Sequence, residues 1–147
     1  MGSSFTEFRG YGFWARDSSL EVWLYLLVRE VGKMTDPPDW LRLAREDWHL
    51  KATVGFLGWI CANLDEHITS TDRVEATVRL SNDALAWLHQ QGPLMSAELL
   101  NSFQCGGEGA YFTRDVETDN FIRVGEAFVQ LLEGKLKTDA ATSPVLA

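Results

Sequence analysis

The sequence has few of the residue types from which disulfide scaffolds and metal sites are built. Of its 147 residues only two are cysteine, Cys61 and Cys105, and three are histidine. The histidines, His49, His67 and His89, form neither an HExxH motif nor a pair spaced i, i+4. Two cysteines cannot supply a disulfide framework or a four-cysteine zinc site. We therefore expect no metal and no cofactor, and a fold that depends on its hydrophobic core.

Motifs that carry catalysis are also missing. There is no Gly-x-Ser-x-Gly nucleophile elbow. The glycine cluster Gly106-Gly107-x-Gly109 follows an expected helix rather than a strand, and no lysine follows it, so it does not favour a phosphate-binding loop. Cys105 lies at the expected C-terminal end of that helix, where the helix dipole disfavours a reactive thiolate. The sequence therefore predicts no catalytic residue and a protein that is not an enzyme.

Positive charge is scarce. The chain has 13 lysines and arginines against 21 aspartates and glutamates, which gives a net charge of −8. Such a chain lacks the basic face that binding to a phosphate backbone requires, so direct nucleic-acid binding is not expected. The acidity favours a partner that is itself basic.

The N-terminus shows no basic region followed by an apolar run and a cleavage site, from which we expect a cytoplasmic location.

The segment around which the chain is organised is the apolar stretch from Asp17 to Gly32. Ser18-x-x-Glu21 matches a capping box, which predicts a helix start. A helix that is apolar on every side is buried by its neighbours. Charged residues bracket only seven apolar residues here, whereas a membrane span needs about 20, so membrane insertion is not expected. The apolar side chains are Leu20, Val22, Trp23, Leu24, Tyr25, Leu26, Leu27, Val28 and Val31.

The segments on either side of this central helix are expected to wrap it. In residues 1–16, glycines argue against a helix and aromatic residues against disorder, which predicts an ordered aromatic arm. After the Asp36-Pro37-Pro38 start, apolar spacing continues to His67, so we expect one long helix with a kink or break near 49–55. Gly55, Gly58 and Ala62 would share a face of that helix and allow another helix to approach closely.

The C-terminal half also reads as helical. Residues 73–80 alternate like a strand, but two helical stripes across residues 72–91 favour a helix. Ser96 is expected to cap a short helix, and a last helix is expected to start at 116 or 119 and to end at 136. Residues 138–147 are expected to form a flexible tail. The fold prediction is an all-α single domain over residues 1–147, a bundle of five or six helices around a buried central helix at 17–32.

The longest irregular stretch, residues 104–118, contains the candidate partner-binding residues. Acidic residues at its end suit the first turn of a helix, where they stabilise the helix dipole. An aromatic anchor inside a charged rim is also how many protein interfaces are built, which is the functional interpretation. On that interpretation the partner-binding residues are Glu108, Tyr111, Asp115, Glu117 and Asp119.

The stretch Gly10-Tyr11-Gly12-Phe13-Trp14-x-x-Asp17-x-x-Leu20-Glu21, followed by a hydrophobic helix, resembles the opening of some small bacterial immunity proteins. These proteins are encoded with polymorphic, contact-dependent or type VI-secreted toxins. The resemblance covers roughly 20 residues and carries over no functional residue. It implies a cytosolic, non-enzymatic protein that neutralises a cognate toxin by covering its active site. The acidity would suit a basic toxin, such as a nuclease domain.

Two further functions stay open. The chain could be a small helical enzyme or ligand-binding domain with a pocket lined by tryptophan and tyrosine, which a pocket beside the central helix with convergent carboxylates would favour. It could also be a structural or adaptor subunit whose apolar face completes an oligomer.

Overall fold

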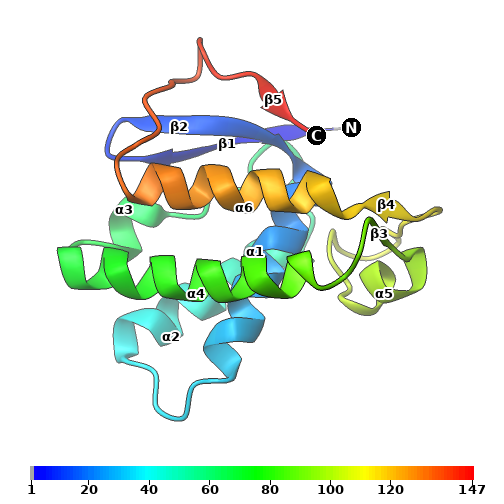
Figure 1. The fold of residues 1–147 in the computed structure, drawn as a ribbon, viewed down its shortest axis with the longest axis horizontal. Helices are drawn as coiled ribbons and strands as arrows, with labels where there is room; N and C mark the ends of the chain where they lie inside the picture. The colour runs from blue at the N-terminus through cyan, green and yellow to red at the C-terminus, as the bar shows by residue number, and fades with distance from the viewer. Residues whose placement is uncertain (1) are drawn as a thin grey trace.

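The computed structural model describes residues 2–147, which contain six helices and five strands (Figure 1). In chain order the elements are β1 (Ser3–Phe8), β2 (Tyr11–Arg16), α1 (Asp17–Gly32), α2 (Asp39–Thr53), α3 (Leu64–His67), α4 (Thr71–His89), β3 (Leu94–Met95), α5 (Ala97–Ser102), β4 (Val116–Glu117), α6 (Thr118–Leu132) and β5 (Val145–Leu146).

The prediction of an all-α domain is wrong, because the fold is a mixture of helices and two small sheets. Residues 3–16, expected to be an arm, form the antiparallel hairpin β1–β2. Arg9 and Gly10 connect the strands with positive φ angles of 51° and 86°, as tight two-residue hairpin turns require. The aromatic residues stabilise this hairpin across the strands, since Phe5 and Trp14 are register partners with ring centroids 5.3 Å apart.

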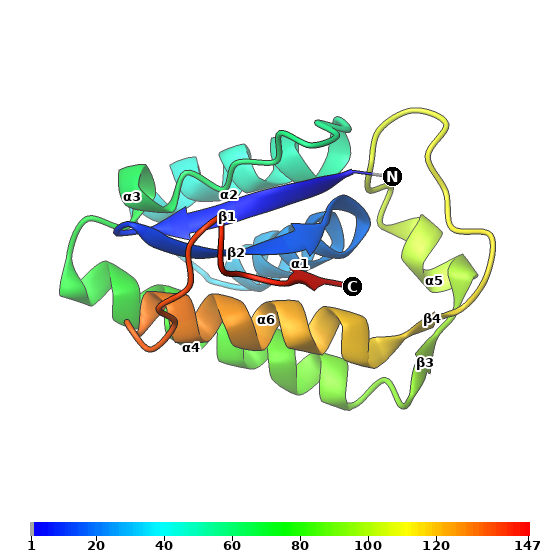
Figure 2. The ribbon, with the colours of Figure 1, turned by 90° about the horizontal axis from the view of Figure 1, so that it is seen from above.

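The C-terminal residues return to the hairpin. Strand β5 pairs in parallel with β2, with Trp14 opposite Val145, and so forms a three-stranded sheet in the order β1-β2-β5 (Figure 2). The indole nitrogen of Trp14 also donates a hydrogen bond of 2.8 Å to the carbonyl oxygen of Ala140. Residues 138–147, expected to be a flexible tail, therefore make defined contacts with the sheet.

Helix α1 lies at the centre, as its apolar sequence predicts, with twelve of its sixteen residues buried. The hairpin covers it from one side, while α2 and the pair α4–α6 flank it (Figure 2). Helix α6 approaches α1 closely at Gly125, where an added Cβ would come within 2.6 Å of the Trp23 ring. Trp23 packs edge-on against Phe128 of α6, with ring centroids 5.7 Å apart. The close helix approach expected at 55–62 is instead made by Gly125.

The long helix expected from 36 to 67 is two helices separated by an irregular loop of residues 54–63. Helix α2 ends at Thr53, inside the interval where a kink or break is expected. Gly55 and Gly58 follow with φ angles of 90° and 76°, which no helix contains. The expectation that Gly55, Gly58 and Ala62 share a helix face is therefore wrong. Cys61 is exposed on this loop.

Two local signals in the C-terminal half were interpreted correctly. Residues 71–89 form helix α4 rather than a strand, and the Ser70 hydroxyl caps it by accepting from the backbone N–H of Arg73. Ser96 caps α5 in the same way through the N–H of Leu99. Residues 116–117, a possible start of the last helix, pair with β3 as strand β4 before α6 begins.

Among residues 2–147, no helix has the length and apolarity needed to cross a bilayer.

Candidate partner-binding surface

Helix α2 has apolar residues on two opposite sides. Its inner side packs in the core through Leu41, Ala44, Trp48 and Ala52, all of which are buried. Its outer side also carries leucines, spaced seven residues apart, that remain exposed to solvent: Leu43 is 61% and Leu50 48% exposed. A surface helix normally places polar residues on that side.

The apolar outer side continues into the loop that leaves the helix. Val54 and Leu57 are exposed, and the side chain of Trp59 is 82% exposed. Single exposed apolar residues are common, but a succession of them marks a binding surface. We define the α2 surface as Leu43, Leu50, Val54, Leu57 and Trp59.

The backbone on both sides of Trp59 is held in place by buried polar groups. On one side, the N–H of Gly58 donates to Oδ2 of Asp17 at 2.7 Å. On the other side, the N–H of Ile60 donates at 3.0 Å to the Ser4 hydroxyl, which in turn donates to Oδ1 of Asp17 at 2.6 Å. Asp17 is 1% exposed and begins α1. The indole ring is therefore exposed on a backbone that is anchored to both β1 and α1.

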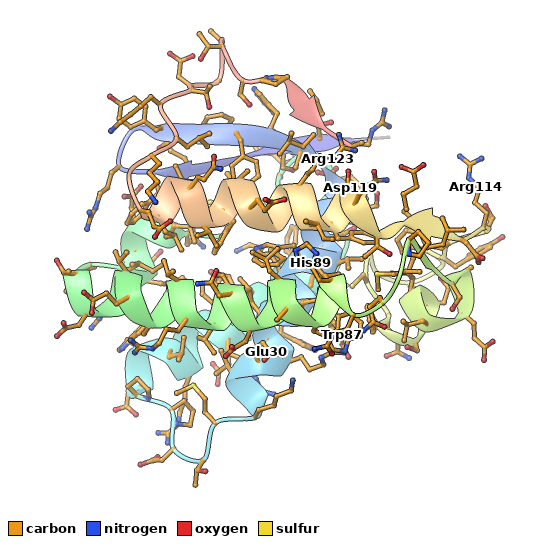
Figure 3. The ribbon with its side chains drawn as sticks, in the orientation of Figure 1. Glu30, Trp87, His89, Arg114, Asp119 and Arg123 are labelled. Atoms are coloured by element: carbon orange, nitrogen blue, oxygen red, sulfur yellow. The ribbon has the colours of Figure 1, made fainter. Side chains whose placement is uncertain are left out.

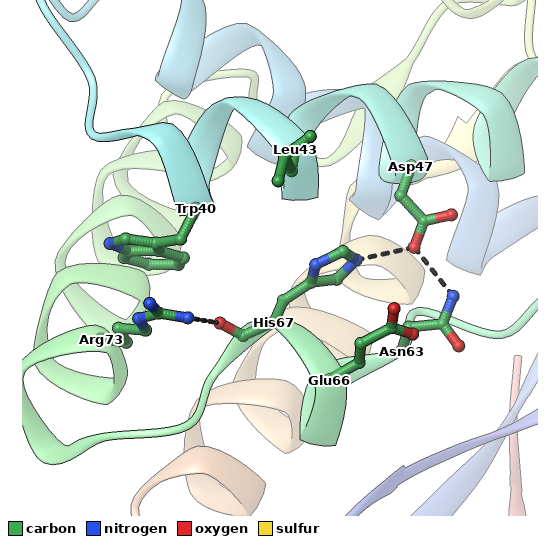
Figure 4. A pocket seen from close by; sticks show the side chains of 7 residues that line it. All are labelled: Trp40, Leu43, Asp47, Asn63, Glu66, His67 and Arg73. Atoms are coloured by element: carbon green, nitrogen blue, oxygen red, sulfur yellow. Dashed lines mark hydrogen bonds and ion pairs between the residues drawn. The ribbon is translucent and has the colours of Figure 1, made fainter.

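A second anchor joins the end of this loop to α2 around Asp47 (Figure 4). Its carboxylate accepts hydrogen bonds of 2.8 Å from Lys51, 2.9 Å from Asn63 and 2.8 Å from Nε2 of His67. Burial raises the pKa of Asp47, but these hydrogen bonds outweigh it and hold the pKa below its ordinary value. Trp48 adds a hydrogen bond of 2.8 Å from its indole nitrogen to the carbonyl oxygen of Ala62.

The Asp47–His67 pair has the appearance of a catalytic dyad, but its surroundings do not support that role. The pair lies in a hollow of about 360 Å³ whose described lining is Trp40, Leu43, Asp47, Asn63, Glu66, His67 and Arg73. That lining contains no hydroxyl or thiol for the imidazole to activate. Lys51 and Asn63 share the same carboxylate, so the cluster is best explained as the attachment of α3 to α2. His67 is the last residue of α3, and its side chain is only 12% exposed in this cluster.

The charges beside the α2 surface are unequally satisfied. Arg42 pairs with Asp36 and Asp39, and Lys51 pairs with Asp47, so these cations are engaged within the chain. Glu46 and Glu66 are exposed and have no ion-pair partner within residues 2–147. Arg45 of α2 and Arg73 beside Glu66 also form no ion pair within residues 2–147 and donate instead to backbone carbonyl oxygens, so unpaired charges of both signs lie beside this surface.

All five residues predicted from the sequence are exposed, but the structure divides them between two places. Glu108 and Tyr111 line a hollow of about 670 Å³ together with His49 and Thr53 of α2. The loop that carries them is attached to the end of α2, because Gly106 donates its N–H to the carbonyl oxygen of Ala52 at 2.8 Å. These two residues therefore lie beside the C-terminal end of α2.

The other three predicted residues lie at the starts of α5 and α6. Asp115 accepts a hydrogen bond of 3.1 Å from the N–H of Ala97, the first residue of α5. Asp119 pairs with Arg123 one turn further along α6 at 3.1 Å (Figure 3). Glu117 and Asp119 line a separate hollow beside α4. Asp115 and Asp119 thus take part in interactions within the chain at these helix starts.

Cys105 has no reactive environment. Its thiol donates to the backbone carbonyl oxygen of Glu21 at 3.7 Å. Burial and the Glu21 carboxyl group raise the pKa of Cys105 to about 12, so the thiolate is not populated near neutral pH. Across residues 2–147 no three His, Cys, Asp or Glu side chains converge as metal ligands would.

The sequence contained a signal for the α2 surface that the periodicity concealed. Trp59 continues the helical spacing of Trp40, Ala44 and Trp48, the spacing that predicts one long helix to His67. Two glycines within five residues, Gly55 and Gly58, argue against a continuous helix. With the helix ended before them, the leucines at 43 and 50 stand out on an otherwise polar side.

Compared with models of known protein families, with curated proteins and with solved structures, the chain shows no significant match.

Proposed function

We propose that this protein is a non-catalytic binding protein of the immunity type, which neutralises a cognate bacterial toxin by covering its active site. The α2 surface forms the centre of the contact. The observation that carries the proposal is Trp59, whose ring is 82% exposed while the backbone amides on both sides of it are hydrogen-bonded to buried groups.

A rigidly presented tryptophan suits the centre of an interface. Tryptophan is among the residues that contribute most to binding when buried in a partner's pocket. Holding the loop in its bound conformation before contact reduces the entropy lost on association. Leu50 and Val54 at the end of α2, and Leu57 in the loop that carries Trp59, add further exposed apolar side chains, and Glu108 and Tyr111 line a hollow with His49 and Thr53 of α2.

The net charge of the chain favours a basic partner. Glu46 and Glu66 lack ion-pair partners within residues 2–147, and the whole chain carries a net charge of −8. Complementary charge accelerates association and discriminates against acidic proteins. A toxin with a basic substrate cleft, such as a nuclease domain, has the matching charge.

The test is to mix the protein with the toxin encoded in the neighbouring reading frame and to measure both the dissociation constant and the protection of toxin-treated cells. We expect a tight complex that Trp59→Ala weakens about 30-fold or more, as truncation of a central anchor does. The matched control is Leu94→Ala, which removes an exposed leucine of β3 far along the chain from α2. A complex that both variants leave unchanged would contradict the assigned surface, and no complex would contradict the function.

A further measurement separates this proposal from the oligomer alternative. An exposed apolar surface can also bind a second copy of the same chain. Light scattering after size exclusion is expected to give a monomer in the absence of toxin. A dimer that Trp59→Ala dissociates would instead support a structural or adaptor subunit.

A further inference from the structure

The loop of residues 104–115 covers a cavity beside the first turns of α1. The cavity has a volume of about 560 Å³. Its described lining includes Glu21 of α1, Cys105 and Phe112 of the loop, and Phe121 of α6. Arg16 and Arg114 also line it, and both are exposed to solvent. The cavity is therefore acidic and aromatic in its buried part and basic toward solvent.

Glu21 is buried in the cavity wall without satisfying its carboxyl group. The residue is 4% exposed, and Oε2 has no hydrogen-bond partner among residues 2–147. The capping box predicted at Ser18-x-x-Glu21 is wrong, because α1 begins without a side-chain cap and Glu21 does not reach back to its start. A Cβ added at Gly106 would lie 3.5 Å from Oε1 and 3.7 Å from Oε2, so the carboxyl group lies directly against the loop.

The other buried acidic residues are satisfied, which distinguishes Glu21 from them. Asp17, one turn earlier in α1, accepts from Ser4 and from Gly58. Glu30, near the end of the same helix, pairs with Lys33 at 2.8 Å. Buried polar groups normally have partners, so an unpaired buried carboxyl group that lines a cavity needs an explanation. Burial, and secondarily Asp17, raise the pKa of Glu21 to about 7.

We propose that this cavity binds a primary ammonium group, carried either by a small monoamine or by a lysine side chain of a protein partner. The ammonium donates to the Glu21 carboxylate and replaces the missing hydrogen-bond partner. Phe112 and Phe121 contact the attached alkyl chain, and aromatic rings also attract a nearby cation. This inference is independent of the toxin-neutralising function.

The basic residues that line the cavity restrict the number of positive charges that a ligand can carry. Arg16 and Arg114 place positive charge where the cavity meets solvent. Figure 3 shows Arg114 directed away from the helices at the outer end of the molecule. A polyamine would bring its additional charges close to these arginines. A ligand with a single ammonium avoids this repulsion, because its one charge lies at Glu21.

The test is a titration followed by the amide NMR spectrum, with n-pentylammonium as the probe and 1-pentanol as its neutral counterpart. We expect saturable shifts at Gly106 and Phe112 with n-pentylammonium and at least about tenfold weaker binding of 1-pentanol, since a hydrogen bond to a charged group is strong. Spermidine should also bind more weakly than n-pentylammonium.

The decisive variant is Glu21→Gln, which keeps the shape of the side chain and removes its charge. It should lose n-pentylammonium binding, while Glu75→Gln, on the exposed side of α4, should keep it. Amide shifts elsewhere in the spectrum report whether the variant is folded. No binding to the unmodified protein, equal binding of 1-pentanol, or full binding by Glu21→Gln would overturn the proposal.

Two further binding measurements identify the molecule that carries the ammonium group. If it belongs to a partner's lysine, Nα-acetyl-lysine N-methylamide should bind as the monoamine does, and Glu21→Gln should weaken the toxin complex about tenfold. If it belongs to a free amine, Glu21→Gln should abolish n-pentylammonium binding and leave the toxin complex unchanged. A failure of the toxin experiment leaves the n-pentylammonium titration decisive for the cavity.

Discussion

Two irregular loops cover the first two turns of α1, and each lies over one acidic residue. Residues 54–63 lie over Asp17, whose carboxylate accepts from the N–H of Gly58 and from the Ser4 hydroxyl. Residues 104–115 lie over Glu21, whose Oε2 accepts nothing within residues 2–147. The two acids are four residues apart on one helix. The difference shows that a buried carboxyl group holds a loop in place only where the loop points a donor at it.

The largest loss of stability is expected on removal of Asp17, the buried acid whose carboxylate is fully hydrogen-bonded. Asp17→Ala leaves the buried Ser4 hydroxyl and the part-buried N–H of Gly58 without their acceptor, which should lower the free energy of unfolding by about 3 to 4 kcal/mol at neutral pH. Urea denaturation measures this change. Glu75→Ala on the surface of α4 is the control and should shift stability by less than about 0.5 kcal/mol. A loss below about 1 kcal/mol would show that Asp17 does not anchor the loop.

Replacing Glu21, the buried acid whose Oε2 has no hydrogen-bond partner within residues 2–147, is expected to raise the free energy of unfolding rather than lower it. Because burial and Asp17 raise the pKa of Glu21 from 4.5 to about 7, the folded state binds a proton more tightly than the unfolded state. This contribution to stability is fully present below pH 4.5 and is lost as pH rises toward 7. Asp17 acts on this carboxyl group, and the other ionisable side chains that line the same cavity are Arg16, Cys105, Tyr111 and Arg114.

Glu21→Gln should therefore stabilise the protein at pH 8 by at most about 3 kcal/mol and have little effect at pH 4. Urea denaturation of both proteins across this pH range tests the difference. A variant that is equally destabilised at both pH values would show that Glu21 has a satisfied structural role.

A loss of stability of intermediate size is expected on removal of the Asn101 side chain, which attaches the loop of residues 104–115 to α5. Asn101 of α5 donates to the carbonyl oxygen of Phe112 at 3.0 Å and accepts from the N–H of Phe112 at 2.6 Å. Asn101→Ala should cost about 1 to 2 kcal/mol, because both hydrogen bonds are only partly buried. Hydrogen exchange should quicken in residues 104–115 and stay unchanged in 54–63. Equal acceleration in both loops would mean that they open together.

The smallest effect on stability is expected at the most exposed aromatic residue. Trp59→Ala should change the free energy of unfolding by less than about 0.5 kcal/mol, since its ring makes little buried contact. Trp48→Ala, in the preceding helix α2 and fully buried, should cost about 4 kcal/mol. Thermal or urea unfolding of the two variants measures the contrast. A large loss for Trp59→Ala would place the ring in the core and remove it from the proposed interface.

Prediction from the sequence succeeded where the signal was local. The all-round apolarity of residues 20–31 identified the buried helix, and Ser96 marked the start of α5. Prediction failed where two segments distant in the chain had to pair. Strand β5 lies about 130 residues from its partner β2, and no pattern in either segment specifies that partner. The resulting all-α assignment was therefore wrong in the terminal segments and at the short β3–β4 pair.

For the candidate sites, too, local signals were predicted from the sequence and contacts between distant segments were not. Tyr111 and Glu108 were recognised as exposed from composition, and they lie beside the C-terminal end of α2. Trp59 was missed because its spacing from Trp48 matches a helical stripe, and only the glycine conformations at 55 and 58 turn it outward. Glu21 was interpreted as a capping residue for a similar reason, since the capping-box pattern does not reveal which loop covers the helix start.

The sequence by itself determined that this chain has a buried helix at 17–32, few cations, and no cysteine framework. Those properties depend on residue identity and short spacing. Tertiary structure alone decided that the N-terminal aromatic residues form a hairpin, that Trp59 is exposed, and that Asp17 is satisfied while Glu21 is not. These outcomes depend on which distant groups meet, because a buried polar group is stabilised by the partner that the fold places beside it.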